Sequence, residues 1–173
     1  PIVLKDDDLD EARSNALLVF ETINNRGMDL QDADIFKAKL YYMSLSVGKG
    51  EEFKEQWKNL ISRCDDLDLK IDDLFRYYYH IIRGKEGIVI AEKRLREFFQ
   101  KDPKSPFKTG GYEIVLDDLQ KTLDAIEEYY YKRTEPTRLG AWLQVLDAYT
   151  NQNPVYALIV FLYFHKETTD DAL

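Results

Sequence analysis

Apolar side chains recur every three or four residues along most of this chain, which is the spacing of one face of an α-helix. The clearest stripe consists of Ala33, Phe36, Leu40, Met43 and Val47, at spacings of 3, 4, 3 and 4. The pattern predicts helices over about 9–24, 31–47, 50–63, 71–83, 88–100, 112–132, 137–150 and 154–166. The sequence therefore predicts an all-α fold, a bundle-like domain of many helices.

Glycines and acidic residues mark where these helices are expected to end. Gly48 and Gly50 follow the helix over 31–47, and Gly84 follows the helix over 71–83. The longest irregular connection is predicted over 101–111. Residues 2–5, Ile-Val-Leu-Lys, are typical of a β-strand, which the aspartates at 6–8 would stop abruptly. We therefore expect a short extended segment before the helices.

Aromatic residues supply much of the predicted core. Trp57 and Trp142 are expected to anchor it, and Tyr77–Tyr79 and Tyr129–Tyr131 form two runs of three tyrosines. Three consecutive residues on a helix cannot share one face, so at least one tyrosine of each run is expected in the core.

The composition is that of a folded, water-exposed domain. Of the 173 residues, 45% are hydrophobic and 32% charged. The longest apolar run, at 155–164, is shorter than the roughly 18 residues of a membrane span, so no membrane partner is expected. The acidic start at 1–10 lacks the basic region of a signal peptide. A single cysteine, Cys64, fits a reducing cytoplasm, and two histidines without cysteine pairs disfavour a zinc site.

Charge is unevenly distributed along the chain. The net charge is −8, yet residues 83–108 hold eight Lys/Arg and four Asp/Glu, a local charge of +4. This stretch is either a solvated helix or a basic face that contacts nucleic acid. The tyrosines beside it either belong to the core or stack on unpaired bases. His80 is either an interfacial histidine or a general base. The candidate nucleic-acid contacts are Arg76, Tyr77, His80, Arg83 and Lys85.

The connection at 20–34, Phe-Glu-Thr-Ile-Asn-Asn-Arg-Gly-Met-Asp-Leu-Gln-Asp-Ala-Asp, admits two interpretations. In the first it is a structural turn: Gly27 ends one helix, and Asp34 returns its carboxylate to the first turn of the next. In the second, Asn24, Arg26 and Asp34 converge on a phosphate or a metal-bound phosphate. Arginine supplies a forked donor set, asparagine an amide, and aspartate a ligand for Mg²⁺.

The segment at 19–40, Val-Phe-Glu-Thr-Ile-Asn-Asn-Arg-Gly-Met-Asp-Leu-Gln-Asp-Ala-Asp-Ile-Phe-Lys-Ala-Lys-Leu, resembles a signature of the GmrS-like, ParB-related family. That signature runs approximately Phe-Glu-x-x-Asn-x-x-Gly-x-x-Leu-Ser/Thr-x-x-Asp-x-x-Lys. The resemblance covers about the first 45 residues. At position 31 this chain has Gln31, a poor helix cap, where the family commonly has Ser or Thr. The matching residues are Phe20, Glu21, Asn24, Arg26, Gly27, Leu30, Asp34 and Lys37.

The resemblance implies a role in modification-dependent restriction or other phage defence. Family members pair a ParB-like nucleotide-binding domain, which carries an Asp-Gly-Gln-Gln-Arg motif, with a C-terminal nuclease domain in many cases. That motif does not occur in this sequence, nor does an HNH-like histidine cluster. The start at Pro1 and the end at Thr-Thr-Asp-Asp-Ala-Leu also suggest a piece of a longer protein. We therefore expect 1–30 to be the tail of a nucleotide-binding domain and 31–173 a helical domain packed with it.

Two functional hypotheses follow. In the first, Asn24, Arg26, Gly27, Asp34 and Lys37 contribute to a nucleotide or phosphate site that residues outside this chain complete. Mg²⁺ and a nucleoside triphosphate would then be cofactors of the longer protein, an NTP-hydrolysing and DNA-cleaving enzyme, and this piece would be inactive alone. Its partners would be the upstream nucleotide-binding part, the nuclease domain and DNA. In the second, the chain is a helical scaffold or interaction module with no catalytic site.

Overall fold

The computed structural model describes residues 31–149 and 153–165, and every regular element within them is an α-helix. The all-α prediction is therefore confirmed. The predicted strand at 2–5 and helix at 9–24 lie outside the described residues. The helices are α2 (Asp32–Ser46), α3 (Gly50–Asp66), α4 (Ile71–Lys85), α5 (Leu95–Lys101), α6 (Pro106–Thr109), α7 (Tyr112–Thr134), α8 (Arg138–Asp147) and α9 (Asn153–His165).

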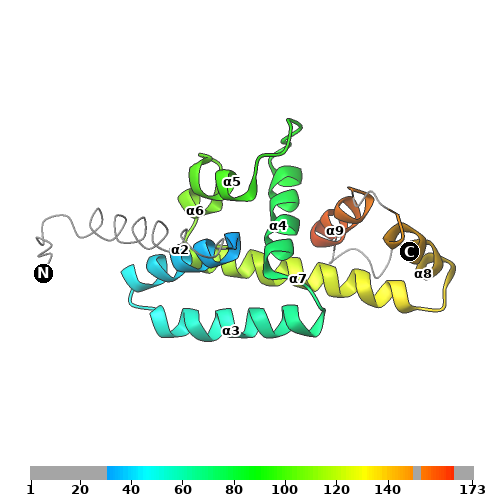
Figure 1. Cartoon of the computed structure of the whole chain (residues 1–173), viewed down its shortest axis with the longest axis horizontal. Coiled ribbons are helices and arrows are strands. Elements are labelled where there is room, and N and C mark those ends of the chain that lie inside the picture. Colours follow the sequence, from blue (N-terminus) through cyan, green and yellow to red (C-terminus); the bar gives the residue numbers. More distant parts are fainter. Residues whose placement is uncertain (1–30, 150–152, 166–173) are drawn as a thin grey trace, which may run out of the picture.

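The long helix α7 is the element on which the others assemble (Figure 1). It contacts α2, α3, α4 and α9, while α2 also packs against α3. α8 folds back on the C-terminal half of α7, where Tyr129 donates a hydrogen bond of 2.6 Å to Asp147. The α2–α3 pair and the α8–α9 pair are thus two ends of one helical body.

The core forms where the apolar stripes of the helices meet. Leu123 and Ile126 of α7 have no exposed surface. Phe36 of α2, Phe75 of α4 and Phe99 of α5 lie with ring centroids 4.8 to 5.4 Å apart. Burying a side chain of this size stabilises the fold by about 2 kcal/mol before entropy is counted. These aromatic contacts therefore join three helices that are distant in sequence.

Most residues predicted to face inward do so. The expectation for the tyrosine runs is confirmed as well, because Tyr78, Tyr79 and Tyr129 are buried and Tyr131 is 67% exposed. The buried members of the predicted stripe are Ala33, Phe36 and Leu40.

The first turn of α2 is capped by a different helix. Gln31 makes no side-chain capping hydrogen bond, in keeping with its poor capping chemistry. Instead the backbone N–H of Ala33 donates to Asp72 of α4 at 2.8 Å, and Asp32 accepts from Arg96 at 2.9 Å. Burial raises the pKa of Asp72, and the bond from Ala33 opposes that rise. The start of α2 is therefore tied to α4 and to the first turn of α5.

The helix predicted over 88–100 is wrong in its first half, since α5 begins only at Leu95. α4 runs past Gly84 to Lys85, and Gly87, with φ of +61°, follows it. A Cβ at Gly84 would lie 3.0 Å from Val160, so this glycine permits the approach of α9 rather than ending a helix. The backbone N–H of Lys93 donates to the Tyr79 hydroxyl at 3.0 Å, which satisfies it without helical bonding.

Two predicted core positions are exposed. Trp142 is 57% exposed, whereas Trp57 is 5% exposed as expected. α8 turns Gly140 and Leu143 towards the molecule, which places Trp142 on its outer side. Val47 is 61% exposed because α2 ends at Ser46, before the stripe reaches it.

α9 is apolar over nearly its whole circumference but has only 13 residues. Val155, Ile159 and Leu162 bury one side of it. Within the part of the chain that the structure describes, no helix combines the length and the apolar character that crossing a membrane requires.

Candidate ligand-binding groove

A groove of about 610 Å³ lies between α2 and α3. Asp34 and Lys37, two of the residues predicted for a phosphate or nucleotide site, line it from α2. They are three residues apart and so share one helix face. Asn24, Arg26 and Gly27 lie outside the described residues. The structure thus brings the two helical members of the predicted site together on one wall.

Aromatic and aliphatic side chains form the floor of the groove. Trp57 stacks on Phe53 with ring centroids 5.7 Å apart and planes 26° apart. Tyr41 of α2 meets Phe53 at 5.8 Å, and Ile61 extends the apolar surface by one turn of α3. Trp57 is almost buried and contributes a small part of the floor, while Tyr41 is half-buried. The floor is therefore apolar and held in place by the core behind it.

Lysines dominate the rim. Lys37 from α2 and Lys54 and Lys58 from α3 are exposed, and Asp34 supplies the one carboxylate among the residues that line the groove. The Lys37 ammonium lies 5.9 Å from the Trp57 ring centroid, and that of Lys54 lies 5.6 Å from the Tyr41 ring. Lys54 also donates to Glu51 at 2.6 Å, a bond that raises its pKa. The rim is locally positive in an acidic protein, which favours an anionic ligand.

The sequence reasoning missed the contribution of α3. Lys54 and Lys58 are four residues apart with Trp57 between them, a spacing that places all three on one side of a helix. That pattern was readable, but it is also typical of an ordinary solvated helix edge. Only the pairing of α2 with α3 turns it into one wall of a groove.

The lining of the groove offers few groups that could coordinate a metal ion. Asp34 supplies the one carboxylate among its lining residues, and no histidine or cysteine lines it. In the described ranges no group of three or more His, Cys, Asp or Glu side chains is arranged to hold a metal ion. Mg²⁺ usually takes one or two carboxylates and completes its shell with phosphate and water oxygens. Asp34 therefore fits Mg²⁺ only when a phosphorylated ligand brings the remaining oxygens.

The predicted nucleic-acid contacts of α4 divide into two groups. In the first, Tyr77 and His80 pack around Tyr156 of α9, with ring centroids 5.0 and 4.3 Å away. Burial raises the pKa of Tyr77. Burial also lowers the pKa of His80, against the opposing effect of Glu92 at 3.7 Å. Arg76 lies beside this cluster, 4.0 Å from Asp73. The rings of Tyr77 and His80 thus join α4 to α9. Base stacking by Tyr77 remains a prediction.

The second group lies at the C-terminal end of α4. Arg83 donates to the backbone oxygen of Ile90 at 2.7 Å and lies 5.5 Å from the Tyr79 ring. Its guanidinium therefore holds the irregular segment that follows the helix. Lys85 is exposed on the last turn.

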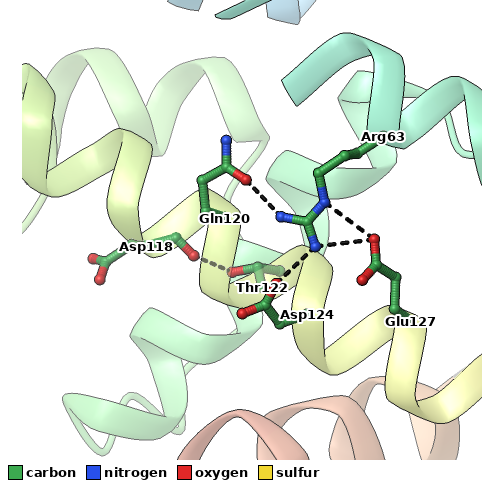
Figure 2. A network of polar contacts seen from close by, with 6 residues as sticks. All are labelled: Arg63, Asp118, Gln120, Thr122, Asp124 and Glu127. Atoms are coloured by element: carbon green, nitrogen blue, oxygen red, sulfur yellow. Dashed lines mark hydrogen bonds and ion pairs between the residues drawn. The ribbon is translucent and has the colours of Figure 1, made fainter. Parts of the chain in front are cut away.

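A polar network fixes α3 against α7 on the side away from the groove floor. Figure 2 shows the Arg63 guanidinium of α3 between three side chains of α7. It donates to Gln120 at 2.5 Å, to Asp124 at 2.6 Å and to Glu127 at 3.1 Å. Thr122 of α7 bonds instead to the backbone oxygen of Asp118, within its own helix. The Arg63 contacts hold α3, and with it one wall of the groove, in a fixed position on α7.

No family model, curated protein or solved structure matches this chain. The chemistry of the groove is therefore inferred from its own residues. The resemblance of residues 19–40 to the GmrS-like signature stays a prediction.

Proposed function

We propose that this chain is the helical part of a GmrS-like defence protein and that its α2–α3 groove binds a nucleotide or a related phosphorylated ligand. One observation carries the proposal. Asp34 and Lys37 belong to the signature and line an apolar groove, to whose rim α3 adds Lys54 and Lys58. The groove therefore combines two signature residues with two further lysines around one apolar floor.

The groove offers complementary surfaces to such a ligand. Its apolar floor, to which Tyr41 and Trp57 contribute, accepts the planar base. The rim lysines have flexible stems, so their ammonium groups can leave the aromatic rings and reach phosphate oxygens. Asp34 takes part in holding Mg²⁺ once the phosphates are present. Each feature favours a ligand that is flat at one end and anionic at the other.

The remaining chemistry belongs to other parts of the longer protein in this proposal. Asn24, Arg26 and Gly27 join the site from the segment before α2, together with an upstream nucleotide-binding part. Hydrolysis of the nucleotide and cleavage of DNA by a C-terminal nuclease take place outside this chain. DNA contacts along α4 and a cytoplasmic location belong to the same proposal.

Trp57 provides a direct test, because the chain has only two tryptophans and the other, Trp142, lies on α8. In a Trp142→Phe background, titration with ATP or UTP in the presence of Mg²⁺ should change the fluorescence of Trp57. Lys37→Ala should weaken binding about tenfold or more, since a charge-assisted contact contributes about 1.5–3 kcal/mol. Lys39→Ala is the matched control, because Lys39 is an exposed lysine of α2 outside the groove lining.

Calorimetry with a longer protein that restores the upstream sequence separates the remaining outcomes. Binding by the longer protein alone, abolished by Arg26→Ala, would make the loop and the groove two halves of one site. Absence of binding by both proteins would reject the proposal and leave the segment at 24–27 as a helix connection.

The second candidate function is a helical scaffold without a catalytic site. It is favoured by the exposed apolar side chains of α8, which a purely ligand-binding domain does not need. If it is right, the chain binds other domains of the longer protein in size-exclusion chromatography while nucleotide has no effect on Trp57.

A further inference from the structure

The outer face of α8 is an exposed apolar stripe. Leu139, Trp142 and Val145 of α8 are 43%, 57% and 51% exposed, and Leu146 beside them is half-buried. Tyr149, two residues beyond the end of the helix, is 63% exposed. At 100° per residue the four side chains of α8 occupy about a third of the circumference of the helix. Together with Tyr149 they are the surface that we call the α8 stripe.

α8 is held rigidly from its inner side. Thr137 caps it by accepting the Gly140 N–H at 3.0 Å. Asp147 at its far end accepts from Tyr129 at 2.6 Å and from Arg133, and Gln144 donates to the backbone of α7. The α8 stripe is therefore fixed in place and does not collapse onto its own core.

The α8 stripe is also uncharged. The ten residues of α8 include two charged ones, Arg138 at its first position and Asp147, whose carboxylate is engaged by α7. In a chain with 32% charged residues and a net charge of −8, such a face is where two copies can approach with the least electrostatic repulsion. Depletion of charge and enrichment of aromatic residues characterise the centre of homodimer interfaces.

We propose that the α8 stripe pairs with the α8 stripe of a second copy of this chain, antiparallel about a twofold axis. The stripe is self-complementary in this arrangement, whose centre lies near residue 144. Leu139 then meets Tyr149 of the second copy, Trp142 meets Leu146 of the second copy, and Val145 lies beside the axis. Each aromatic ring packs against an aliphatic side chain, and each contact occurs twice about the axis, as an isologous interface requires.

The exposed area sets the expected strength. The stripe exposes on the order of 500 Å² per copy, which is below the roughly 800 Å² per partner of a standard interface. The association should therefore be weak, reversible and dependent on concentration. Phe161 and Phe164 of α9, 51% and 45% exposed on a helix that contacts α8, are further apolar surface at this end of the molecule.

Sedimentation equilibrium over low to high micromolar concentrations tests the proposal. The apparent mass should rise above the 20.4 kDa of one chain and approach twice that value. Trp142→Glu should keep the single-chain mass at every concentration with an unchanged circular dichroism spectrum. Val89→Glu is the matched control, because Val89 is 95% exposed and lies far from α8 in sequence; it should associate as the wild type does.

Cross-linking gives a second readout from a milder substitution. Val145→Cys, close to the twofold axis, should form a disulfide-linked dimer on oxidation, whereas Val89→Cys should not. The native Cys64 is 1% exposed and does not compete. A wild-type protein that stays monomeric throughout, or equal cross-linking of both variants, would overturn the proposal and assign the stripe to a different polypeptide.

Discussion

Replacing Arg63 with methionine should destabilise the domain by separating α3 from α7. The side chain spans the gap between the two helices and donates to Gln120, Asp124 and Glu127, which lie on successive turns of α7 (Figure 2). Methionine retains most of the stem but removes all of these donors. The remaining carboxylates of Asp124 and Glu127 then face each other at a spacing of three residues without a cation.

The magnitude follows from the partial burial of the network. The Arg63 side chain is 29% exposed, and those of Asp124 and Glu127 are 33% and 42% exposed. An exposed ion pair contributes about 0.2–1 kcal/mol, whereas hydrogen bonds to charged groups contribute about 1.5–3 kcal/mol each when shielded. Solvent screens the Glu127 contact most. We therefore expect the free energy of unfolding to fall by about 2 kcal/mol, including about 0.3 kcal/mol of repulsion between the carboxylates.

Urea unfolding followed by circular dichroism measures this loss. With a slope of about 2 kcal/mol per molar urea, the midpoint should fall by about 1 M. Lys121→Met is the matched control, since Lys121 pairs with Asp117 at 2.7 Å with both side chains more than half exposed; it should change stability by less than about 0.5 kcal/mol. A loss for Arg63→Met as small as that of the control would refute the reasoning. High salt should reduce the difference in unfolding free energy between Arg63→Met and wild type only in part, because partly buried charges are screened less than exposed ones.

Three further predictions concern single sites. Because burial lowers the pKa of His80 below its ordinary value of about 6.5, the unfolded chain binds the proton more readily, and folding stability should decrease as the pH falls from about 7; the pH dependence of urea unfolding should be flatter in His80→Gln. Burial raises the pKa of the Cys64 thiol to about 11, so a thiol-specific reagent at pH 8 should modify it only in denaturant, and rapid modification of the native protein would contradict its burial. Gly140→Ala should lower the free energy of unfolding by about 1–3 kcal/mol in thermal or urea unfolding, because the added Cβ would lie 2.2 Å from the backbone oxygen of Glu135. Gly111→Ala should lower it far less, because a Cβ added there would meet no atom within 4 Å.

The sequence by itself determined the fold class and most helices. α4 is the best example, because Leu74, Phe75 and Tyr78 form an apolar face that buries against neighbouring helices whatever their order. Helical periodicity is a local property, so it survives without knowledge of the partners. Asp34 became a candidate through the side chains of the connection at 20–34 and Lys37 through the resemblance of residues 19–40 to the GmrS-like signature, and their spacing on one helix face is also a local property.

Features that depend on contacts between distant segments were decided by the tertiary structure alone. Gln31 gave no sign that Asp72, 39 residues away from Ala33, would cap α2. Gly84 looked like a helix end, yet it allows α9 to approach α4. Lys54 and Lys58 became part of a candidate site only when α3 paired with α2. The physical reason is common to all of these: capping, close approach and electrostatic focusing depend on distances across the fold, which periodicity along the chain does not encode.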